Sequence, residues 1–228
     1  MSFFVLFSLN SFSQTKKDYL VIIQTKFGAM HLVLFDKTPL HKANFLKLAN
    51  DKFYDGVLFH RIIKNFMIQG GDPTTKTKNQ VEAPTKESVS YKIKAEILPE
   101  LFHVKGALAA ARDNNPDKES SGSQFYIVHG KAWNEADLEG QIKRCGRPVT
   151  EAQKNTYKTT GGSPHLDGNY TVFGQLIGGF AVLDSLANVK TGARDKPLDD
   201  ISMKMTVEKM RKKKILKKYK DKSIDFSF

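Results

Sequence analysis

The stretch F-H-R-I-I-K-N-F-M-I-Q-G-G-D, from Phe59 to Asp72, places two short apolar segments on either side of a polar bend. Leu58 to Ile63 and Phe66 to Gln69 are predicted to be strands. Because side chains alternate along a strand, Arg61 lies on the same face as Ile63, and Met67 lies on the same face as Gln69. Pairing of the two strands can therefore bring a guanidinium, a thioether and an amide onto one concave surface.

This surface has none of the common patterns of catalytic chemistry. It contains neither an acid–base pair nor a nucleophile with its base, and Gly70-Gly71 lacks the spacing of a dinucleotide-binding or phosphate-binding loop. Most arginines are not catalytic, so spacing alone favours a structural salt bridge for Arg61 over a catalytic role.

Outward from this stretch, the chain alternates short strands with few helices. Thr38-Pro39 is a helix start, with a hydroxyl cap and proline at the first position, and that helix runs to about Asn50. A second helix fits Phe180 to Leu186. The other expected strands are 18–25, 29–35, 106–111, 124–128, 171–176 and 201–207. This order predicts a mainly β fold, a closed eight-stranded antiparallel barrel capped by two α-helices.

Two segments do not fit this barrel pattern, residues 131–163 and the basic end of the chain, and the first residues also differ from the rest. We therefore divide the chain into a possible signal segment (1–13), one domain (14–207) and a basic tail (208–228). Within the domain, 131–163 is a long, mostly polar insert, which we expect to be a functional or mobile loop. The tail holds much of the net charge of +12, because Lys204 to Lys222 contains ten basic and two acidic residues. Such charge blocks are usually solvated, although this one could meet an anionic surface.

The first residues resemble an export signal. Phe3 to Leu9 is an apolar run too short to span a bilayer, and Ser11 to Ser13 looks like a small-residue cleavage site. No basic residue precedes the run, which departs from the usual pattern. We expect export, to the periplasm, with a cytoplasmic location as the alternative.

Cysteine and histidine usage points away from metal and redox chemistry. Cys145 is the single cysteine, so it cannot form an internal disulfide, and an incidental residue is favoured over a reactive thiol. The six histidines show no ligand spacing. We therefore expect no metal and no cofactor.

Four motifs together resemble the cyclophilin family. They are the stretch from Phe59 to Asp72, G-A-L-A-A-A-R (106–112), S-G-S-Q-F-Y-I (121–127) and H-L-D-G-N-Y-T-V-F-G (165–174). One motif would be weak, but four in the family's order, covering about 19–207 apart from the insert, are specific. The resemblance implies a peptidyl-prolyl cis/trans isomerase that acts on X-Pro bonds of proline-containing polypeptides and assists protein folding.

The resemblance also assigns roles to individual residues. It makes Arg61 the catalytic residue. It places the proline pocket at Phe66, Met67, Tyr126 and Leu166, and the polar part of the groove at Gln69 and Gln124. Ala110, Ala111 and Arg112 would flank the bound peptide, and His60 would neighbour the pocket.

Three substrate-groove positions depart from the family pattern. Tyr126 stands where most members have Phe, and its hydroxyl needs a partner or water. His165 stands where many members have a Trp that helps to hold cyclosporin, so we expect weak or no cyclosporin binding. Tyr170 stands where His is frequent and alters the rim. Arg61 and the apolar pocket remain, so we expect activity.

Two other function classes stay open. A cyclophilin-like module could grip proline segments without turnover. Alternatively, Arg211 to Lys214 could bind phosphates, although nucleic acid is an unfavoured partner if the chain is exported. We expect a monomer. The sequence does not define a role for the insert, although it could cover the groove and select substrates, because both of its ends adjoin predicted pocket residues.

Overall fold

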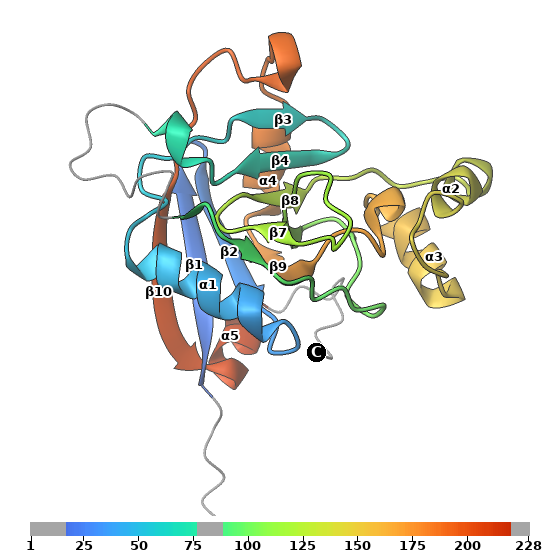
Figure 1. Ribbon diagram of the computed structural model, residues 1–228, viewed down its shortest axis with the longest axis horizontal. Coiled ribbons are helices and arrows are strands. Elements are labelled where there is room, and N and C mark those ends of the chain that lie inside the picture. Colours follow the sequence, from blue (N-terminus) through green and yellow to red (C-terminus); the bar gives the residue numbers. More distant parts are fainter. Residues whose placement is uncertain (1–16, 77–88, 220–228) are drawn as a thin grey trace, which may run out of the picture.

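An eight-stranded antiparallel sheet organises the protein, which we describe from a computed structural model over residues 17–76 and 89–219 (Figure 1). The strand order is β10-β1-β2-β9-β6-β8-β4-β3. The strands are β1 (Lys17–Thr25), β2 (Gly28–Leu34), β3 (Arg61–Ile63), β4 (Met67–Gly70), β6 (Ala107–Ala110), β8 (Phe125–Val128), β9 (Val172–Gly178) and β10 (Lys204–Arg211). A separate two-stranded sheet pairs β5 (Lys92–Ile93) with β7 (Ser120–Ser121). All eight strands expected from the sequence are therefore present.

The expected closure into a barrel is wrong. The sheet ends at β10 on one side and at β3 on the other, and these two strands do not pair with each other. The segment just before β3 contacts the segment just before β10 instead. The contacts are an isolated bridge between Leu58 and Ser202 and backbone hydrogen bonds such as that from Phe59 N to Ile201 O (2.9 Å). β3 has only three residues, so it offers little backbone for a closing ladder.

Side-chain alternation divides the buried residues between the two faces of this sheet. Ile68, Leu108 and Ile127 contribute to the main core. Their neighbours along the chain, including Met67 and Tyr126, belong to a second apolar cluster. The second cluster is the one that lines the candidate site below, so strand register alone sets which residues face it.

The helices α1 (Pro39–Asn50) and α4 (Phe180–Ala187) cover the main core, as expected. The expected hydroxyl cap on α1 is absent, because the Thr38 hydroxyl donates to the Phe35 carbonyl. Glu96 takes its place: its two carboxylate oxygens accept from the backbone N–H groups of Leu40 and His41, both at 3.0 Å. A carboxylate at a helix N-terminus also suits the helix dipole.

The insert is helical, which corrects the expectation of a loop. It contains α2 (Glu135–Ile142) and α3 (Glu151–Thr159), which extend beside the sheet on the right of Figure 1. α3 begins with a capping box, in which the side chains of Thr150 and Gln153 each accept from the other residue's backbone N–H. Short 3₁₀ helices lie at Pro73–Thr75, at Pro164–Leu166 (η3), which follows the insert, and at Ala193–Asp195 (η4).

The basic tail begins as part of the fold. β10 continues to Arg211 and leads into α5 (Lys212–Lys218). Ile215 of α5 is 1% exposed and packs with Leu20 and Ile177 in a small third cluster. The possible signal segment (1–13), residues 77–88 and residues 220–228 of the tail lie outside the described residues.

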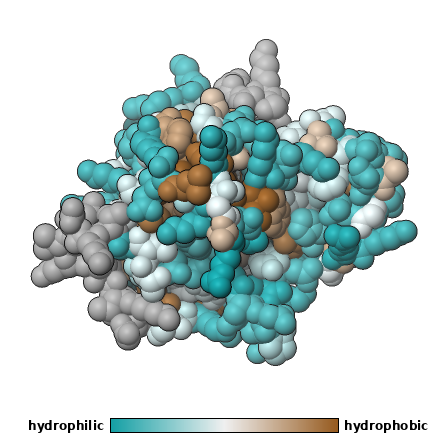
Figure 2. Space-filling view, turned by 90° about the horizontal axis from the view of Figure 1, so that it is seen from above, coloured by the Kyte–Doolittle hydropathy of each residue, from teal (hydrophilic) through white to brown (hydrophobic). Residues whose placement is uncertain are grey.

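Most of the face seen from above is hydrophilic, and apolar surface gathers near its middle (Figure 2). Among the described residues, no helix is both long and apolar enough to cross a membrane. Over the same residues, no group of three or more His, Cys, Asp and Glu side chains could hold a metal ion.

Candidate active site

Register across three strands brings the central predicted residues together. Arg61 of β3 lies opposite Gln69 of β4, and Gln69 lies opposite Tyr126 of β8. Tyr126 in turn pairs with Ala109 of β6. Residues directly opposite each other on antiparallel strands point to the same face. One row across the sheet therefore carries a guanidinium, an amide and a phenol.

A cavity of about 230 Å³ opens on this row. Its lining joins residues of three strands (β3, β4 and β8), of the β3–β4 turn, of η3 and of the chain just after β6 and just before β9: Arg61, Phe66, Met67, Gln69, Ala111, Arg112, Tyr126, Leu166 and Tyr170. Met67, Tyr126 and Leu166 are buried and form its apolar floor, whereas the side chain of Arg61 is 42% exposed at its edge. The structure thus collects nine of the thirteen residues assigned from the sequence around one small apolar space beside a cation.

A second cavity of about 500 Å³ adjoins the first, because Gln69, Ala111 and Arg112 line both. Gln124 lies in this second cavity, where its Oε1 accepts from Gln69 Nε2 at 3.1 Å and its Nε2 donates to Asp72 at 3.4 Å. We describe the two adjoining cavities as one groove, with an apolar end at Met67, Tyr126 and Leu166 and a polar end at Gln124 and Asp72.

Three assigned residues do not line either cavity. Ala110 is buried in the main core, on the opposite face from Tyr126. His165 packs its ring against Phe66, a lining residue of the first cavity, with centroids 5.4 Å apart. His60 precedes β3, and its backbone N–H bonds to Gln69 O at 3.0 Å. Burial lowers the pKa of both histidines, so near neutral pH they are mainly uncharged.

Arg112 and Tyr170 form the rim. The guanidinium carbon of Arg112 lies 4.8 Å from the centre of the Tyr170 ring, a cation–π contact. Arg112 Nε also donates to Asn169 O at 2.9 Å. Tyr170 meets Tyr126 edge to face at 6.0 Å. These contacts hold Arg112 at the border between the two cavities and Tyr170 at the first cavity.

The structure adds residues that the sequence reading did not single out. Asp195 of η4 accepts from Arg61 Nε at 3.3 Å. The Tyr126 hydroxyl, for which a partner or water is expected from the sequence, lies 3.0 Å from His103 Nε2 and so has a hydrogen-bond partner within the protein. Asp167, which contacts His103, lies inside the fourth motif and was therefore visible in sequence, whereas nothing in the sequence connects Asp195 to Arg61.

Cys145 of the insert takes no part in the cavity lining. Its thiol donates to Pro164 O across 2.8 Å, and burial raises the pKa of Cys145 to about 11. Such a thiol is poorly nucleophilic, so the incidental reading of this cysteine is the better one.

The chemistry open to the first cavity is non-covalent. Among the described residues that line it there is no Ser, Cys or Lys. Burial, the largest cause, raises the pKa of Tyr126 well above its usual value, so its phenol stays protonated. A fixed cation next to a dry apolar pocket can stabilise a change of charge distribution in a bound amide.

Comparison with known proteins identifies the family. Residues 20–208 match the model of the cyclophilin-type peptidyl-prolyl cis-trans isomerase family. A Staphylococcus haemolyticus protein named as a peptidyl-prolyl cis-trans isomerase is 40% identical over 183 residues, covering 79% of this chain and 86% of that protein. A Streptococcus pyogenes protein named as a bifunctional phosphatase/peptidyl-prolyl cis-trans isomerase is 45% identical over 184 residues, but the chain spans only 37% of its length.

Solved structures agree with the sequence matches. A cyclophilin-type peptidyl-prolyl cis-trans isomerase from Cryptosporidium parvum, crystallised in the presence of the dipeptide Ala-Pro, is similar with a TM-score of 0.60 and 30% identity. The match covers 83% of this chain and 98% of that one. With the family model spanning most of the chain and the relatives agreeing, the chain belongs to the cyclophilin-type peptidyl-prolyl cis-trans isomerases.

Proposed function

We propose that Arg61 is the catalytic residue of this isomerase and that the 230 Å³ cavity holds the prolyl ring of the substrate. The observation that carries the proposal is the position of the Arg61 guanidinium at the edge of the apolar floor made by Met67, Tyr126 and Leu166. No covalent bond is made or broken, so the protein only has to bind the twisted amide better than either planar form.

Arginine suits this task for electrostatic reasons. Rotation about a peptide bond meets a barrier of ~18–20 kcal/mol, and twisting localises the lone pair on the prolyl nitrogen. A guanidinium is always charged and presents rigid donors, so it can donate to that nitrogen and favour the twisted state. The apolar pocket holds the ring still and excludes water, which strengthens this interaction.

Arg61 supplies only part of the acceleration. A million-fold rate increase corresponds to about 8 kcal/mol, whereas one charge-assisted hydrogen bond contributes ~1.5–3 kcal/mol net. Positioning by the pocket and contacts along the polar end of the groove supply the larger share. We propose that Gln69, Gln124 and Arg112 bind the backbone on either side of the proline, because they line the two cavities.

The test is cis-to-trans isomerisation of a short Ala-Pro peptide at low temperature with wild-type protein, Arg61→Ala and Arg61→Lys. We expect Arg61→Ala to lower kcat/KM by about 100-fold or more, the size of effect seen when one transition-state donor is removed. Arg61→Lys keeps the charge but loses the planar fork, so its activity should be intermediate. Full activity of folded Arg61→Ala would exclude this residue as the catalytic group.

The remaining expectations stand as proposals beside this one. Folded wild-type protein without turnover would favour a proline-binding module. Export to the periplasm depends on residues 1–13, outside the described part of the chain.

We propose an anionic surface, rather than nucleic acid, as a partner of the tail, because Lys213, Lys214 and Lys217 are exposed on α5. Replacing these three lysines with Glu should abolish salt-dependent retention on anionic vesicles, and retention by the variant would contradict the proposal.

A further inference from the structure

The carboxylate of Asp167 is fully buried and has two partners on each oxygen. Oδ1 accepts from the backbone N–H of His103 at 3.0 Å and from His103 Nδ1 at 2.8 Å. Oδ2 accepts from the Tyr157 hydroxyl at 2.8 Å and from Arg147 at 2.9 Å. His103 belongs to the segment before β6, whereas Tyr157 and Arg147 both belong to the insert. Asp167 therefore joins the insert to the body of the domain.

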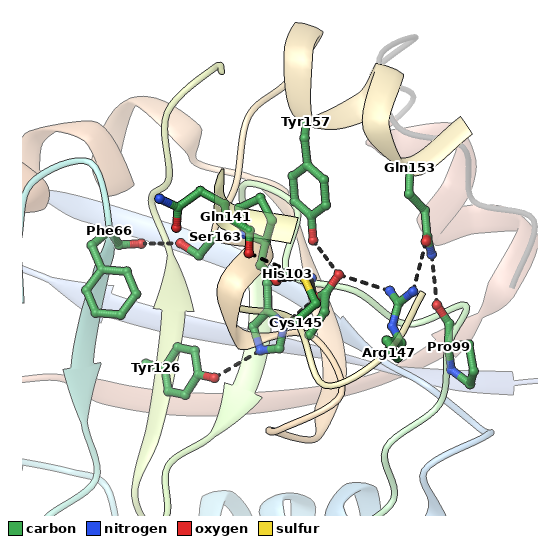
Figure 3. A network of polar contacts seen from close by, with 12 residues as sticks. Phe66, Pro99, His103, Tyr126, Gln141, Cys145, Arg147, Gln153, Tyr157 and Ser163 are labelled. Carbon is green, nitrogen blue, oxygen red and sulfur yellow. Dashed lines mark hydrogen bonds and ion pairs between the residues drawn. The ribbon is translucent and has the colours of Figure 1, made fainter. Parts of the chain in front are cut away.

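The insert partners are themselves held in place. Arg147 also donates to Gln153 Oε1 at 3.0 Å, and Gln153 Nε2 donates to Pro99 O at 2.8 Å. Tyr157 is completely buried, and its ring meets Phe102 edge to face at 5.5 Å. Burial raises the pKa of Tyr157 well above its usual value, so its hydroxyl remains a donor. Figure 3 shows Tyr157, Arg147 and His103 converging from different parts of the chain.

The contacts continue from Asp167 into the pocket. A carboxylate only accepts, so His103 Nδ1 carries the proton that bonds to Asp167, and in the neutral ring Nε2 is left as an acceptor. The Tyr126 hydroxyl lies 3.0 Å from Nε2 and can donate to it. The two rings are also nearly parallel, with centroids 6.0 Å apart. Tyr126 then presents its ring to the cavity beside Arg61.

We propose that the insert is a positioning element for the isomerase pocket, and that it acts through Tyr157, Asp167, His103 and the Tyr126 hydroxyl. None of these residues except Tyr126 touches the cavity, so the first three are positioning residues. The insert supplies both side-chain partners of Oδ2, so without it a buried carboxylate would lose its ion pair and half of its bonds. Asp167 would then no longer hold the His103 ring in one orientation. His103 in turn would no longer fix the orientation of Tyr126, which lines the pocket.

The inference rests on the proposed pocket but makes a separate claim. Tyr157 and Tyr126 have no direct hydrogen bond in the described structure, so any energetic coupling between them must pass through intervening residues. A double-mutant cycle measures that coupling directly. The four proteins are the wild type, Tyr157→Phe, Tyr126→Phe and the double variant, assayed for kcat and KM on the Ala-Pro peptide.

We expect Tyr157→Phe to lower kcat/KM by about 3- to 10-fold in the wild-type background and by less than about 2-fold when Tyr126 is already Phe. The matched control is Trp133→Phe. Trp133 is also an aromatic donor of the insert, but its Nε1 donates to Gly162 O at 2.9 Å, away from Asp167. Its effect should be equal in both backgrounds. An unchanged effect of Tyr157→Phe in the two backgrounds, or no effect in either, would overturn the proposal.

A spectroscopic readout separates positioning from general stability. The ¹⁵N shifts of the His103 ring should report a protonated Nδ1 in the wild type and should move in both Tyr157→Phe and Tyr126→Phe, but not in Trp133→Phe. Unchanged ¹⁵N shifts of His103 in Tyr157→Phe would contradict the proposed path from Tyr157 through Asp167 to His103. If Tyr157→Phe does not fold, Arg147→Lys serves in the same cycle, since it keeps the charge beside Asp167. Failure of the pocket assignment would instead appear as full activity of Arg61→Ala.

Discussion

Nε of Arg61 donates to Oδ2 of Asp195 across 3.3 Å, although the two residues lie 134 positions apart in the chain. Both side chains are more than 40% exposed, so the pair is weak as a source of stability. Arg194 and Asp195 have φ angles of 58° and 60°, a left-handed backbone that non-glycine residues adopt at a cost. Such strain beside the candidate catalytic group suggests that η4 serves to hold a carboxylate against Arg61.

Replacing Asp195 with Ala should lower kcat/KM at low salt by about 2- to 5-fold, the range that corresponds to an exposed ion pair. The unfolding free energy should change by less than about 0.5 kcal/mol. High salt should shrink the difference between variant and wild type, because exposed charges are screened. The control is Asp51→Ala, which removes an exposed ion pair with Lys47 on α1. Equal rates for Asp195→Ala and wild type at low salt would show that Arg61 needs no such restraint.

The turn between β3 and β4 should make stability depend on pH through His129. The Asn65 N–H donates to His129 Nδ1 at 2.9 Å, and His129 Nε2 donates to Asp184 at 3.2 Å, so the ring is held neutral. Burial, the largest cause, lowers the pKa of His129, Lys105 and Lys64 lower it further, and Asp184 opposes them.

The sign of this effect follows from proton binding. Between the lowered pKa and the unfolded value of 6.5, the unfolded chain binds more protons than the native one. The contribution of His129 to the free energy of unfolding should therefore be complete above that pH window and should be lost as the pH drops through it. Urea midpoints of the wild type and His129→Gln between pH 8 and pH 5 measure the effect. The variant should lose less stability on acidification, and parallel curves would count against His129.

Cyclosporin binding should depend on residue 165. We expect wild-type protein to bind cyclosporin weakly, because His165, packed on Phe66, offers less apolar surface than the Trp found in many family members. His165→Trp should tighten binding by about 10-fold or more, equivalent to ~1.4 kcal/mol. Inhibition of peptide isomerisation is the measurement. Phe27→Trp, which adds an indole in the exposed turn between β1 and β2, is the control. Tight inhibition of the wild type would refute the expectation.

Local patterns in the sequence predicted the strands and much of the site, because alternation and turn residues act over short distances. The stretch from Arg61 to Gln69 is an example: a strand, a bend and a return strand place both residues in one register pair. The contact between Arg61 and Asp195 was beyond such reasoning, because it depends on how η4 folds back over β3. Sheet closure failed for a similar reason, since the number of strands does not determine whether the two edges meet.

The insert was misread although a local signal was present. Thr150 and Gln153 have the spacing of a capping box, which marks a helix start, but the segment is mostly polar and its two helices have only eight and nine residues. Their stability comes from burying Leu138 and Tyr157 rather than from a long apolar stripe. The polar composition that argued for a loop thus includes the groups that satisfy Asp167.

The pairing of β1 with both β2 and β10 has a consequence for biosynthesis. β2 follows β1 directly, whereas β10 is the last strand of the sheet, so β1 has an unpaired edge until nearly all of the domain has left the ribosome. Pairings between distant parts of a chain form slowly, and an open strand edge can recruit other chains. The completed sheet must therefore form after translation of its last strand, and a catalyst of protein folding depends during its own synthesis on protection of that edge.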